Sequence, residues 1–292
     1  MKIKPFGLNT IFFQHVIRIN NKNMKIALID NERMEAQPKL QGLCPCCLQP
    51  VIAKCGKIKV WHWAHRVNTV CDRWWEPETE WHRAWKNNFP IEWQEISLID
   101  EKTGEKHIAD VRTAHNLVIE FQHSHIDPEE RTSREQFYKN MVWIVDGTRL
   151  QRDYPRFIKG FKNFKTNQQG VFFVDFPDEV FPKNWLNSSV PVIFDFCGLS
   201  ALEQDEIKNT LWCLLPENDA TRAVVVGLRK SDFIQITRNR AHLFTIEKPR
   251  VQQPQRQSNL PSRGYNQSTG PRIDDIFKSQ FTKNTTPRKR RW

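Results

Sequence analysis

A cluster of cysteine and histidine side chains constrains the fold of this chain more than any other feature of its sequence. Five of the seven cysteines, together with two histidines, fall between Cys44 and Cys71. An odd number of clustered cysteines is poor evidence for a disulfide framework, and inside a reducing cell such clusters more often bind metal. The Cys44-x₂-Cys47 spacing is that of a metal knuckle, and four such ligands around one cation are typical of tetrahedral Zn²⁺. We therefore predict a zinc-binding module at residues 41–75.

The order of the cysteines and histidines leaves a choice of ligands. The preferred set is Cys44, Cys47, His65 and Cys71. His62 or Cys55 could replace one of them, and Cys46 is the leftover thiol. The alternative is that the free thiols are simply buried as small apolar groups. Because the segment has little regular periodicity, we expect a structural metal that supplies folding energy.

The remaining composition limits the class of protein. The chain has 292 residues, of which 39% are hydrophobic, which is enough for a buried core. No apolar run approaches the ~18–20 residues of a membrane span. The N-terminus has no apolar region followed by a small-residue cleavage site. We therefore expect a cytoplasmic protein without a membrane span.

The positive charge is concentrated at the C-terminus. Residues 248–292 hold 11 Lys/Arg and 2 Asp/Glu, whereas the rest of the chain holds 33 Lys/Arg and 31 Asp/Glu. This tail is poor in apolar groups, so we expect it to be disordered. Its last cluster, Arg288-Lys289-Arg290-Arg291, is predicted to bind nucleic-acid phosphates without sequence preference.

The same tail contains a short apolar pattern. Ile273, Ile276, Phe277 and Phe281 lie at the spacing of one helix face. Such a pattern suits a helix that folds onto a groove of a partner. Residues 273–281 are therefore a predicted protein-docking motif.

Five segments follow from these patterns. They are N-terminal strands at 1–40, the zinc-binding module at 41–75, a core at 76–150, an accessory region at 151–247 and the basic tail at 248–292. The apolar runs at 11–13 and 26–29 predict strands in the first segment, and those at 171–176, 190–196 and 223–226 predict strands in the accessory region.

The core segment has the clearest order of elements. Pro77 suits a first helical turn, and Trp81 and Trp85 lie four apart on one helix face. The pattern then predicts strands at 91–99, 107–112 and 117–122, a helix at 128–140 and a buried strand at 141–145. This order of helix, three strands, helix and strand predicts an α/β (α+β) fold.

Two acidic residues stand inside apolar strands of this core. Asp110 lies between Ala109 and Val111, and Glu120 lies two residues before Gln122, so Glu120 and Gln122 point to the same side of their strand. Carboxylates in apolar strands are costly without a partner, and two that meet repel unless a cation lies between them. We expect Mg²⁺, or Mn²⁺, at this place, where a metal-activated water would attack a phosphodiester.

The helix before these strands offers a third acid. Glu80 could complete the metal site, whereas His82 should face away from Glu80, about 200° around the helix. Glu78 competes with Glu80 for the role. The alternative is that such carboxylates are solvated residues at strand edges.

These motifs, taken in order, resemble those of the CoiA-like competence proteins. The resemblance covers about residues 24–150. The matching motifs are Cys44-Pro45-Cys46-Cys47, His62-Trp63-Ala64-His65, Glu80-Trp81-His82, Ala109-Asp110-Val111, Glu120-Phe121-Gln122-His123-Ser124, and Arg134 with Tyr138.

The resemblance implies a fold and a site. That family is similar to PD-(D/E)XK nucleases, with Gln in place of the usual Lys, so a restriction-endonuclease-like core with a mixed sheet flanked by helices is expected. The resemblance implies that Glu80, Asp110 and Glu120 are metal ligands or their supports and that Gln122 orients water or phosphate. It also implies that Arg134 and Tyr138, and with them Ser124, contact phosphate or brace the site.

Two functions remain open. The first is a metal-dependent nuclease that cleaves DNA and is related to competence and recombination. The second is a non-catalytic nucleic-acid-binding adaptor on a nuclease-like fold, which recruits partners through its basic tail. The retained Asp110, Glu120 and Gln122 favour the first.

Overall fold

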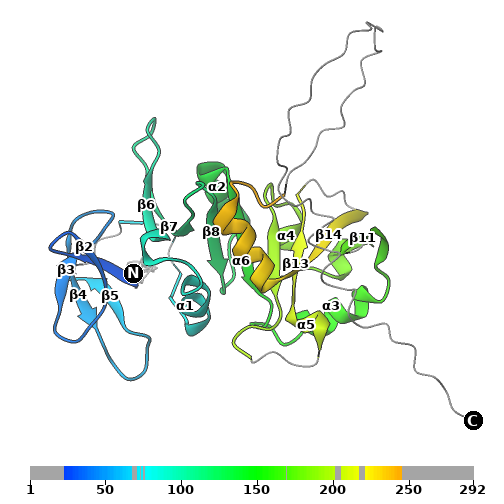
Figure 1. The fold of residues 1–292 in the computed structure, drawn as a ribbon, viewed down its shortest axis with the longest axis horizontal. Helices are drawn as coiled ribbons and strands as arrows, with labels where there is room; N and C mark the ends of the chain where they lie inside the picture. The colour runs from blue at the N-terminus through cyan, green and yellow to red at the C-terminus, as the bar shows by residue number, and fades with distance from the viewer. Residues whose placement is uncertain are drawn as a thin grey trace, which may run out of the picture.

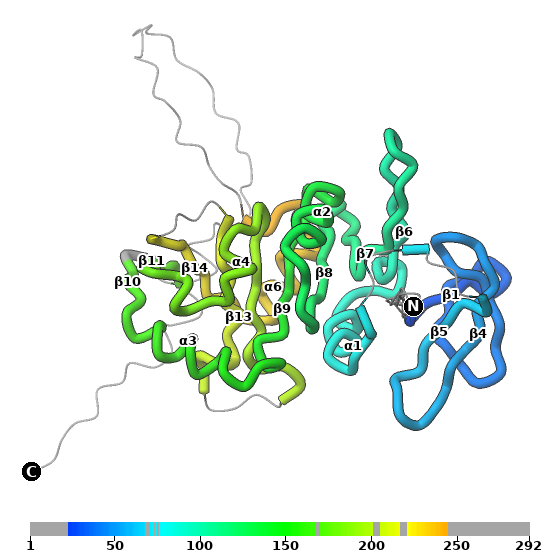
Figure 2. The backbone as a smooth tube through the Cα atoms, turned by 180° about the vertical axis from the view of Figure 1, so that it is seen from behind, coloured from blue at the N-terminus to red at the C-terminus, as the bar shows by residue number. Residues whose placement is uncertain are grey.

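The computed structural model describes residues 23–67, 71–72, 74, 76–168, 170–200, 205–216 and 221–244. Within these ranges the strands form a five-stranded sheet and a nine-stranded sheet. Figures 1 and 2 show the small sheet at one end of the molecule and β11 and β14 at the other, with β6 and β7 next to the small sheet. The predicted strand at 11–13, the docking motif at 273–281 and the basic cluster Arg288–Arg291 lie outside the described residues.

The small sheet is antiparallel, with the order β2-β1-β3-β4-β5. Its strands are β1 (Ile26–Ile29), β2 (Glu32–Glu35), β3 (Gln41–Leu43), β4 (Pro50–Lys54) and β5 (His62–His65). A bridge between Met24 and Trp63 brings the start of the first strand against the last. Residues 41–75 therefore hold three regular strands, although their sequence shows little periodicity. These strands are only three to five residues long, too short to carry a clear pattern.

The large sheet is mixed, with the order β10-β11-β14-β13-β12-β9-β8-β7-β6. Its strands are β6 (Gln94–Ile99), β7 (Lys106–Arg112), β8 (Val118–Gln122), β9 (Met141–Asp146), β10 (Lys165–Gln168), β11 (Val171–Asp175), β12 (Val192–Asp195), β13 (Thr210–Leu214) and β14 (Arg222–Arg229). The sheet draws strands from both sides of residue 150, and the division into segments at that residue stays a prediction.

The centre of the large sheet is parallel. Strand β9 pairs in parallel with β8 on one side and with β12 on the other. All six residues of β9 are buried, as expected for a strand covered on both faces. The carboxyl ends of the three strands therefore meet at one edge of the sheet.

Helices cover both faces of the large sheet. The helices are α1 (Glu80–Lys86), α2 (Pro128–Tyr138), α3 (Asp153–Phe161), α4 (Lys183–Leu186), α5 (Glu206–Asn209) and α6 (Lys230–Asn239), with 3₁₀ turns η1 (Ile91–Trp93) and η2 (Pro177–Glu179). Tyr138 of α2, Phe157 of α3 and Trp185 of α4 pack into one core. Trp85 of α1 and Phe233 of α6 pack into the core on the other face. The predicted mixed sheet flanked by helices is confirmed.

Helix α1 is fixed at both its start and its buried face. Thr79 and His82 form a capping box at its N-terminus. The indole N–H groups of Trp81 and Trp85 both donate to Oδ2 of Asp195, at 3.1 and 2.9 Å. The helix is thereby tied to the carboxyl end of β12.

One predicted strand begins later than its apolar pattern suggests. Residues 91–93 form the 3₁₀ turn η1 after Pro90, and β6 begins only at Gln94. The backbone is also irregular at Glu95, which has a φ of 49°. Among the described helices none is long and apolar enough to cross a membrane.

Candidate functional site

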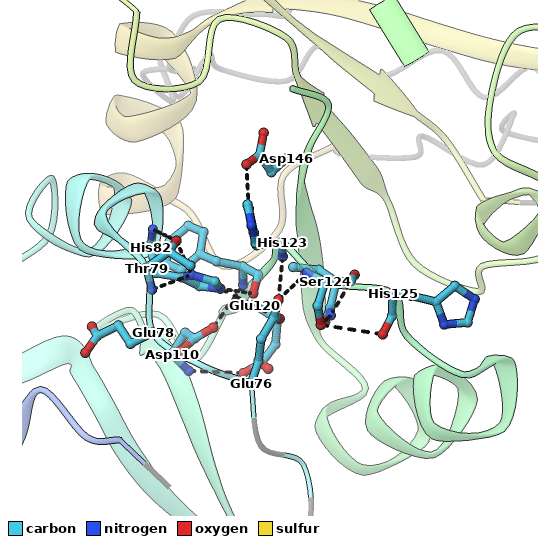
Figure 3. A network of polar contacts seen from close by, with 12 residues as sticks. Glu76, Glu78, Thr79, His82, Asp110, Glu120, His123, Ser124, His125 and Asp146 are labelled. Atoms are coloured by element: carbon cyan, nitrogen blue, oxygen red, sulfur yellow. Dashed lines mark hydrogen bonds and ion pairs between the residues drawn. The ribbon is translucent and has the colours of Figure 1, made fainter. Parts of the chain in front are cut away.

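Strands β7 and β8, helix α1 and the segment before α1 surround a small polar cavity of about 30 Å³. Asp110 and Glu120 both line it, beside Glu76, Glu78, Glu95, His82, Lys86 and Arg134. Figure 3 shows several of these side chains converging from different segments. A cavity of this size holds a water or an ion rather than an organic molecule.

Asp110 and Glu120 meet where β7 and β8 separate. The last paired residues are Val111, which follows Asp110 on β7, and Ile119, which precedes Glu120 on β8. There the backbone N–H of Asp110 donates to Oε1 of Glu120 at 3.0 Å. In return, the backbone N–H of Phe121 donates to Oδ2 of Asp110 at 3.0 Å. The carboxylates thus replace the carbonyl oxygens of the sheet and are held in fixed positions.

Lys86 of α1 is the cation nearest to Asp110. Its buried ammonium lies 3.1 Å from Oδ1 of Asp110, 3.0 Å from Glu95 and 3.5 Å from Glu78. Burial alone would lower the pKa of Lys86, but the three carboxylates outweigh it and hold that pKa well above its ordinary value. Burial would likewise raise the pKa of Asp110, yet Lys86 keeps it below its ordinary range. Both groups are therefore charged at neutral pH.

Glu95 joins this cluster to the small sheet. Its carboxylate accepts the backbone N–H groups of Lys25 and Ile26, both at 2.9 Å, and contacts Lys86 as well. Burial would raise its pKa, but Lys86 and the two backbone donors lower it. One ionised side chain thus ties β6, β1 and α1 together.

Glu120 is paired with a second buried cation. Nη1 of Arg134 lies 3.1 Å from Oε2 of Glu120, and Nη2 contacts Glu130. The guanidinium also lies over the rings of Trp74 and Trp143, 5.7 and 5.8 Å from their centroids. Arg134 therefore braces Glu120 from the side of α2.

Tyr138 is buried one helical turn after Arg134 and stays protonated. Burial raises its pKa, and the nearby charge of Glu120 raises it further. Its ring packs edge-on against Trp74 at 5.9 Å. Tyr138 thus shapes the wall behind Arg134.

Glu76 links the segment before α1 to the end of β8. Its Oε1 accepts the backbone N–H of His123 at 3.0 Å and that of Ser124. Its Oε2 is buried and has no hydrogen bond to the described residues, although the ring of His82 lies 3.7 Å away. An unpartnered buried carboxylate oxygen beside the cavity is the kind of atom that a cation or water would satisfy.

The tautomer of His82 follows from its hydrogen-bond partners. The backbone N–H of Thr79 donates to Nδ1 at 3.2 Å, so Nδ1 is an acceptor. The proton then lies on Nε2, which donates to the carbonyl of Phe121 at 3.2 Å. His82 therefore fixes both the start of α1 and the backbone beside Glu120.

Beyond Glu120, the end of β8 carries the remaining predicted residues. Gln122 is buried, and its Nε2 donates to the carbonyl of Ser124 at 3.2 Å while its Oε1 has no partner among the described residues. Nδ1 of His123 lies 2.7 Å from Asp146. Ser124 is exposed, and Figure 3 shows His125 pointing away from the cluster.

The structure does not bring Glu80 to this cavity. Glu80 is the first residue of α1 and is exposed, whereas His82, two positions later, is buried on the inner face. The helical rotation that separates Glu80 from His82 thus turns Glu80 outward. The acids that reach the cavity from this segment are Glu76 and Glu78.

Sequence reasoning overlooked Lys86, Glu76 and Glu95. The sequence does contain a pattern that could have identified Lys86. His82 and Lys86 lie four residues apart on α1, parallel to the pair Trp81 and Trp85. Two polar residues beside a buried aromatic stripe indicate a polar cavity. For Glu76 and Glu95 no local pattern exists, since their partners are far away in the sequence.

The predicted zinc ligands come together in the small sheet. Cys44, Cys47, His65 and Cys71 offer donor atoms that all lie within 4.8 Å of one another. The Sγ atoms of Cys44 and Cys71 are 3.8 Å apart, and Sγ of Cys47 is 3.2 Å from Nε2 of His65. Two thiolates at ~2.3 Å from a tetrahedral Zn²⁺ would be ~3.8 Å apart. This group could hold a structural metal such as zinc.

The alternative ligands lie outside the group. His62 and His65 point to opposite sides of β5, and Nδ1 of His62 donates to the carbonyl of Val60 at 2.8 Å. Cys55 packs at the edge of the core of the small sheet. A hydrogen bond from Cys71 lowers the pKa of Cys44 to about 4, which favours a thiolate there.

Asp72 connects the metal-binding group to the strand that carries Asp110. It follows Cys71 directly and accepts the backbone N–H of Ile108 at 2.9 Å. Its other oxygen lies 2.8 Å from Nδ1 of His107, on which Trp74 stacks. The group and β7 are thereby held in one unit.

Comparison with known families agrees with this arrangement. The family model for the N-terminal domain of competence protein CoiA matches residues 28–73, which contain all four metal-binding side chains. The model for the nuclease-like domain of CoiA matches residues 105–173, which contain Asp110, Glu120 and Arg134. No curated protein and no solved structure matches the chain. With both models matched in this order, the chain resembles competence protein CoiA over these two regions.

Proposed function

We propose that this protein is a metal-dependent nuclease that cleaves DNA phosphodiester bonds, with Asp110 and Glu120 at its centre. The observation that carries the proposal is the mutual fixation of these two carboxylates at the point where β7 and β8 separate. Catalysis by positioning requires such rigid side chains, because small displacements of reacting groups are costly. The match to a nuclease-like domain over the same strands supports the assignment.

The cavity suits a divalent cation. Asp110 and Glu120 would hold it, with the unpartnered oxygen of Glu76 as a further donor. Carboxylate oxygens are the ligands that Mg²⁺ and Mn²⁺ prefer. When bound, the ion would stabilise the charge that develops on the phosphoryl oxygens. We include in this proposal the similarity to PD-(D/E)XK nucleases that the motifs predict.

Lys86 supplies the positive charge that Gln122 lacks. In our proposal its ammonium, 3.1 Å from Asp110, stabilises negative charge on the phosphate during cleavage. Gln122 orients the attacking water or a phosphate oxygen through its free Oε1. Arg134 and Tyr138 act through Glu120, as positioning residues, and Ser124 contacts the phosphate from the exposed end of β8.

The other parts of the chain complete the proposal. Zinc in the Cys44–Cys71 group acts structurally, and the protein processes DNA for competence and recombination in the cytoplasm. The division into N-terminal strands, zinc-binding module, nuclease-like core, accessory region and tail also belongs to the proposal. The tail binds DNA through Arg288–Arg291 and a protein partner through residues 273–281.

A cleavage assay tests the proposal. The full chain is incubated with Mg²⁺ or Mn²⁺ on single-stranded and double-stranded DNA, beside the Asp110→Ala variant. We expect products from the unmodified protein and none from the variant, with the Glu80→Ala variant as a matched acidic control that still cleaves. Equal product from the unmodified protein and Asp110→Ala would remove the catalytic assignment.

A second candidate function is a non-catalytic DNA-binding adaptor. It is favoured by one observation, namely that Lys86 and Arg134 already neutralise Asp110 and Glu120 in place of a metal ion. DNA binding without cleavage, unchanged by Asp110→Ala, would support the adaptor.

A further inference from the structure

A second and larger cavity lies at the carboxyl ends of the parallel strands. It has a volume of about 230 Å³, far above the ~10–15 Å³ that a single water needs. Its wall includes His123 after β8, Gly147 after β9 and Phe194 near the end of β12. Ligands of open α/β sheets commonly bind outside this edge.

The wall of this cavity is rich in cations. Arg149, Arg152, Arg156 and Lys183 all line it. Arg149 and Arg152 are exposed, and neither forms an ion pair with a described residue. These guanidinium groups are therefore available to an anion from outside.

The other two cations are partly engaged. Arg156 contacts Asp153 at 3.0 Å, yet its Nε is buried and has no hydrogen-bond partner among the described residues. Lys183 contacts the partly buried Asp178 at 3.4 Å. A buried guanidinium N–H without a partner, beside a cavity, points to an acceptor that is supplied by a ligand.

The two acidic side chains of the cavity offset only part of this charge. Asp153 pairs with Arg156 and also attracts Arg152 and Arg149. Asp146 accepts from Thr148 and contacts His123. Helix α3 also begins here, at Asp153, without a side-chain cap, so its N-terminal dipole adds to the positive potential. The cavity thus fits an anion, and planar arginine groups fit phosphate best.

The position of the cavity relates it to the proposed catalytic site. His123 and Ser124 line the larger cavity, and their backbone N–H groups donate to Glu76, which lines the smaller one. Figure 3 shows His123 between Asp146 and Glu76. The two cavities are therefore connected through the backbone of His123 and Ser124.

We infer that the Arg149–Arg152–Arg156 cavity binds backbone phosphates of the DNA strand next to the bond that is cleaved. This inference rests on the proposed function and extends it, because it names where the substrate is held outside the carboxylate site. Contacts to phosphates position a strand without reading its sequence. The cavity therefore contributes affinity and alignment, not base preference.

Fluorescence anisotropy with the full chain in the Asp110→Ala background tests this inference without cleavage. The probe is a short fluorescent single-stranded oligonucleotide. The double variant Arg149→Gln/Arg152→Gln is compared with Lys159→Gln/Lys162→Gln, which removes the same charge from exposed positions of α3 and its C-cap outside the cavity. Each protein carries the same basic tail, so the comparison isolates the cavity.

We expect the arginine variant to raise Kd at least about tenfold, which corresponds to the loss of one charge-assisted hydrogen bond. The slope of log K against log salt should fall by ~0.7 for each lost phosphate contact on a single strand. The lysine variant should change both quantities little. Equal effects of the two double variants would overturn the inference.

A competition experiment distinguishes a site for a DNA strand from a site for a free nucleotide. Deoxyadenosine monophosphate that displaces the oligonucleotide from the Asp110→Ala protein, but not from its arginine variant, would identify a mononucleotide pocket and overturn the strand assignment. The outcome is independent of cleavage. If the protein does not cleave DNA but the arginine variant still raises Kd, the proposed function is refuted and the binding site stands. If the protein cleaves DNA but the arginine variant leaves Kd unchanged, only the binding site is refuted.

Discussion

The ammonium group of Lys86 lies 3.1 Å from Oδ1 of Asp110, although the two residues belong to different motifs of the sequence. The same ammonium contacts Glu95 and Glu78, so one buried cation balances three carboxylates. A buried ion cluster of this kind is sensitive to the loss of any single member, because the remaining charges are left without compensation.

Replacement of Lys86 by Met should destabilise the protein by about 3–5 kcal/mol, since it leaves buried carboxylates unpaired. Urea unfolding followed by tryptophan fluorescence measures this free energy. The matched change Lys159→Met, at an exposed position, should alter stability by no more than about 0.5 kcal/mol. Similar losses in both variants would contradict the role of the cluster.

The cluster also predicts a pH dependence. The pKa of Asp110 is lowered below 3.8, so its contribution to stability is present above that value and is lost as pH falls through the folded pKa. The pKa of Lys86 is raised above 10.5, so its contribution is lost only as pH rises through a still higher value.

We therefore expect the stability difference between the unmodified protein and Asp110→Asn to stay constant from about pH 5 to about pH 9 and to shrink in acid. Urea unfolding at a series of pH values measures it. The Asp178→Asn variant, at a partly exposed position outside the cluster, serves as the control. A difference that grows on acidification would show that Asp110 is not stabilised as a carboxylate.

The position of Glu76 predicts a kinetic contrast with Glu80. Glu76→Gln should lower kcat/KM by about 10–100-fold, because it weakens a further donor to the proposed metal ion. Glu80→Gln should leave kcat/KM unchanged, since Glu80 is exposed outside the cavity. Steady-state cleavage assays on one DNA substrate compare the two. A larger loss with Glu80→Gln would restore that residue to the site.

The metal-binding group predicts a link between zinc and the nuclease-like strands. Cys44→Ser should abolish zinc binding, measured by elemental analysis of the purified chain, and should lower Tm because the metal supplies folding energy. Cys55→Ser removes a thiol outside the group and should retain the zinc. Because Asp72 joins Cys71 to β7, zinc loss should also reduce cleavage. Full zinc content in Cys44→Ser would disprove the ligand assignment.

Much of the fold between residues 76 and 150 can be predicted from the sequence. The apolar alternation in β7 and β8 and the buried run of β9 identify these strands within one or two residues. Their adjacency then places Asp110 near Glu120. The family resemblance is confirmed by the matches to both CoiA domains.

The rest depends on contacts that no local pattern reveals. Glu95 is ionised only because Lys25, Ile26 and Lys86 approach it from other segments. The exposed position of Glu80 follows from the rotation of α1, which is set by the burial of Trp81 and Trp85. Short strands such as β3, in a segment organised around the metal-binding group, carry too few residues for a periodic signal.

The carboxylate of Glu95 has a practical consequence for dissecting this protein. A fragment that starts after the small sheet would keep β6 and the residues matched to the nuclease-like domain but would lack the two backbone donors from Lys25 and Ile26. In that fragment the Glu95 carboxylate would lack these two hydrogen bonds. We therefore expect such a fragment to be less stable than the full chain, so a shortened form should keep the small sheet.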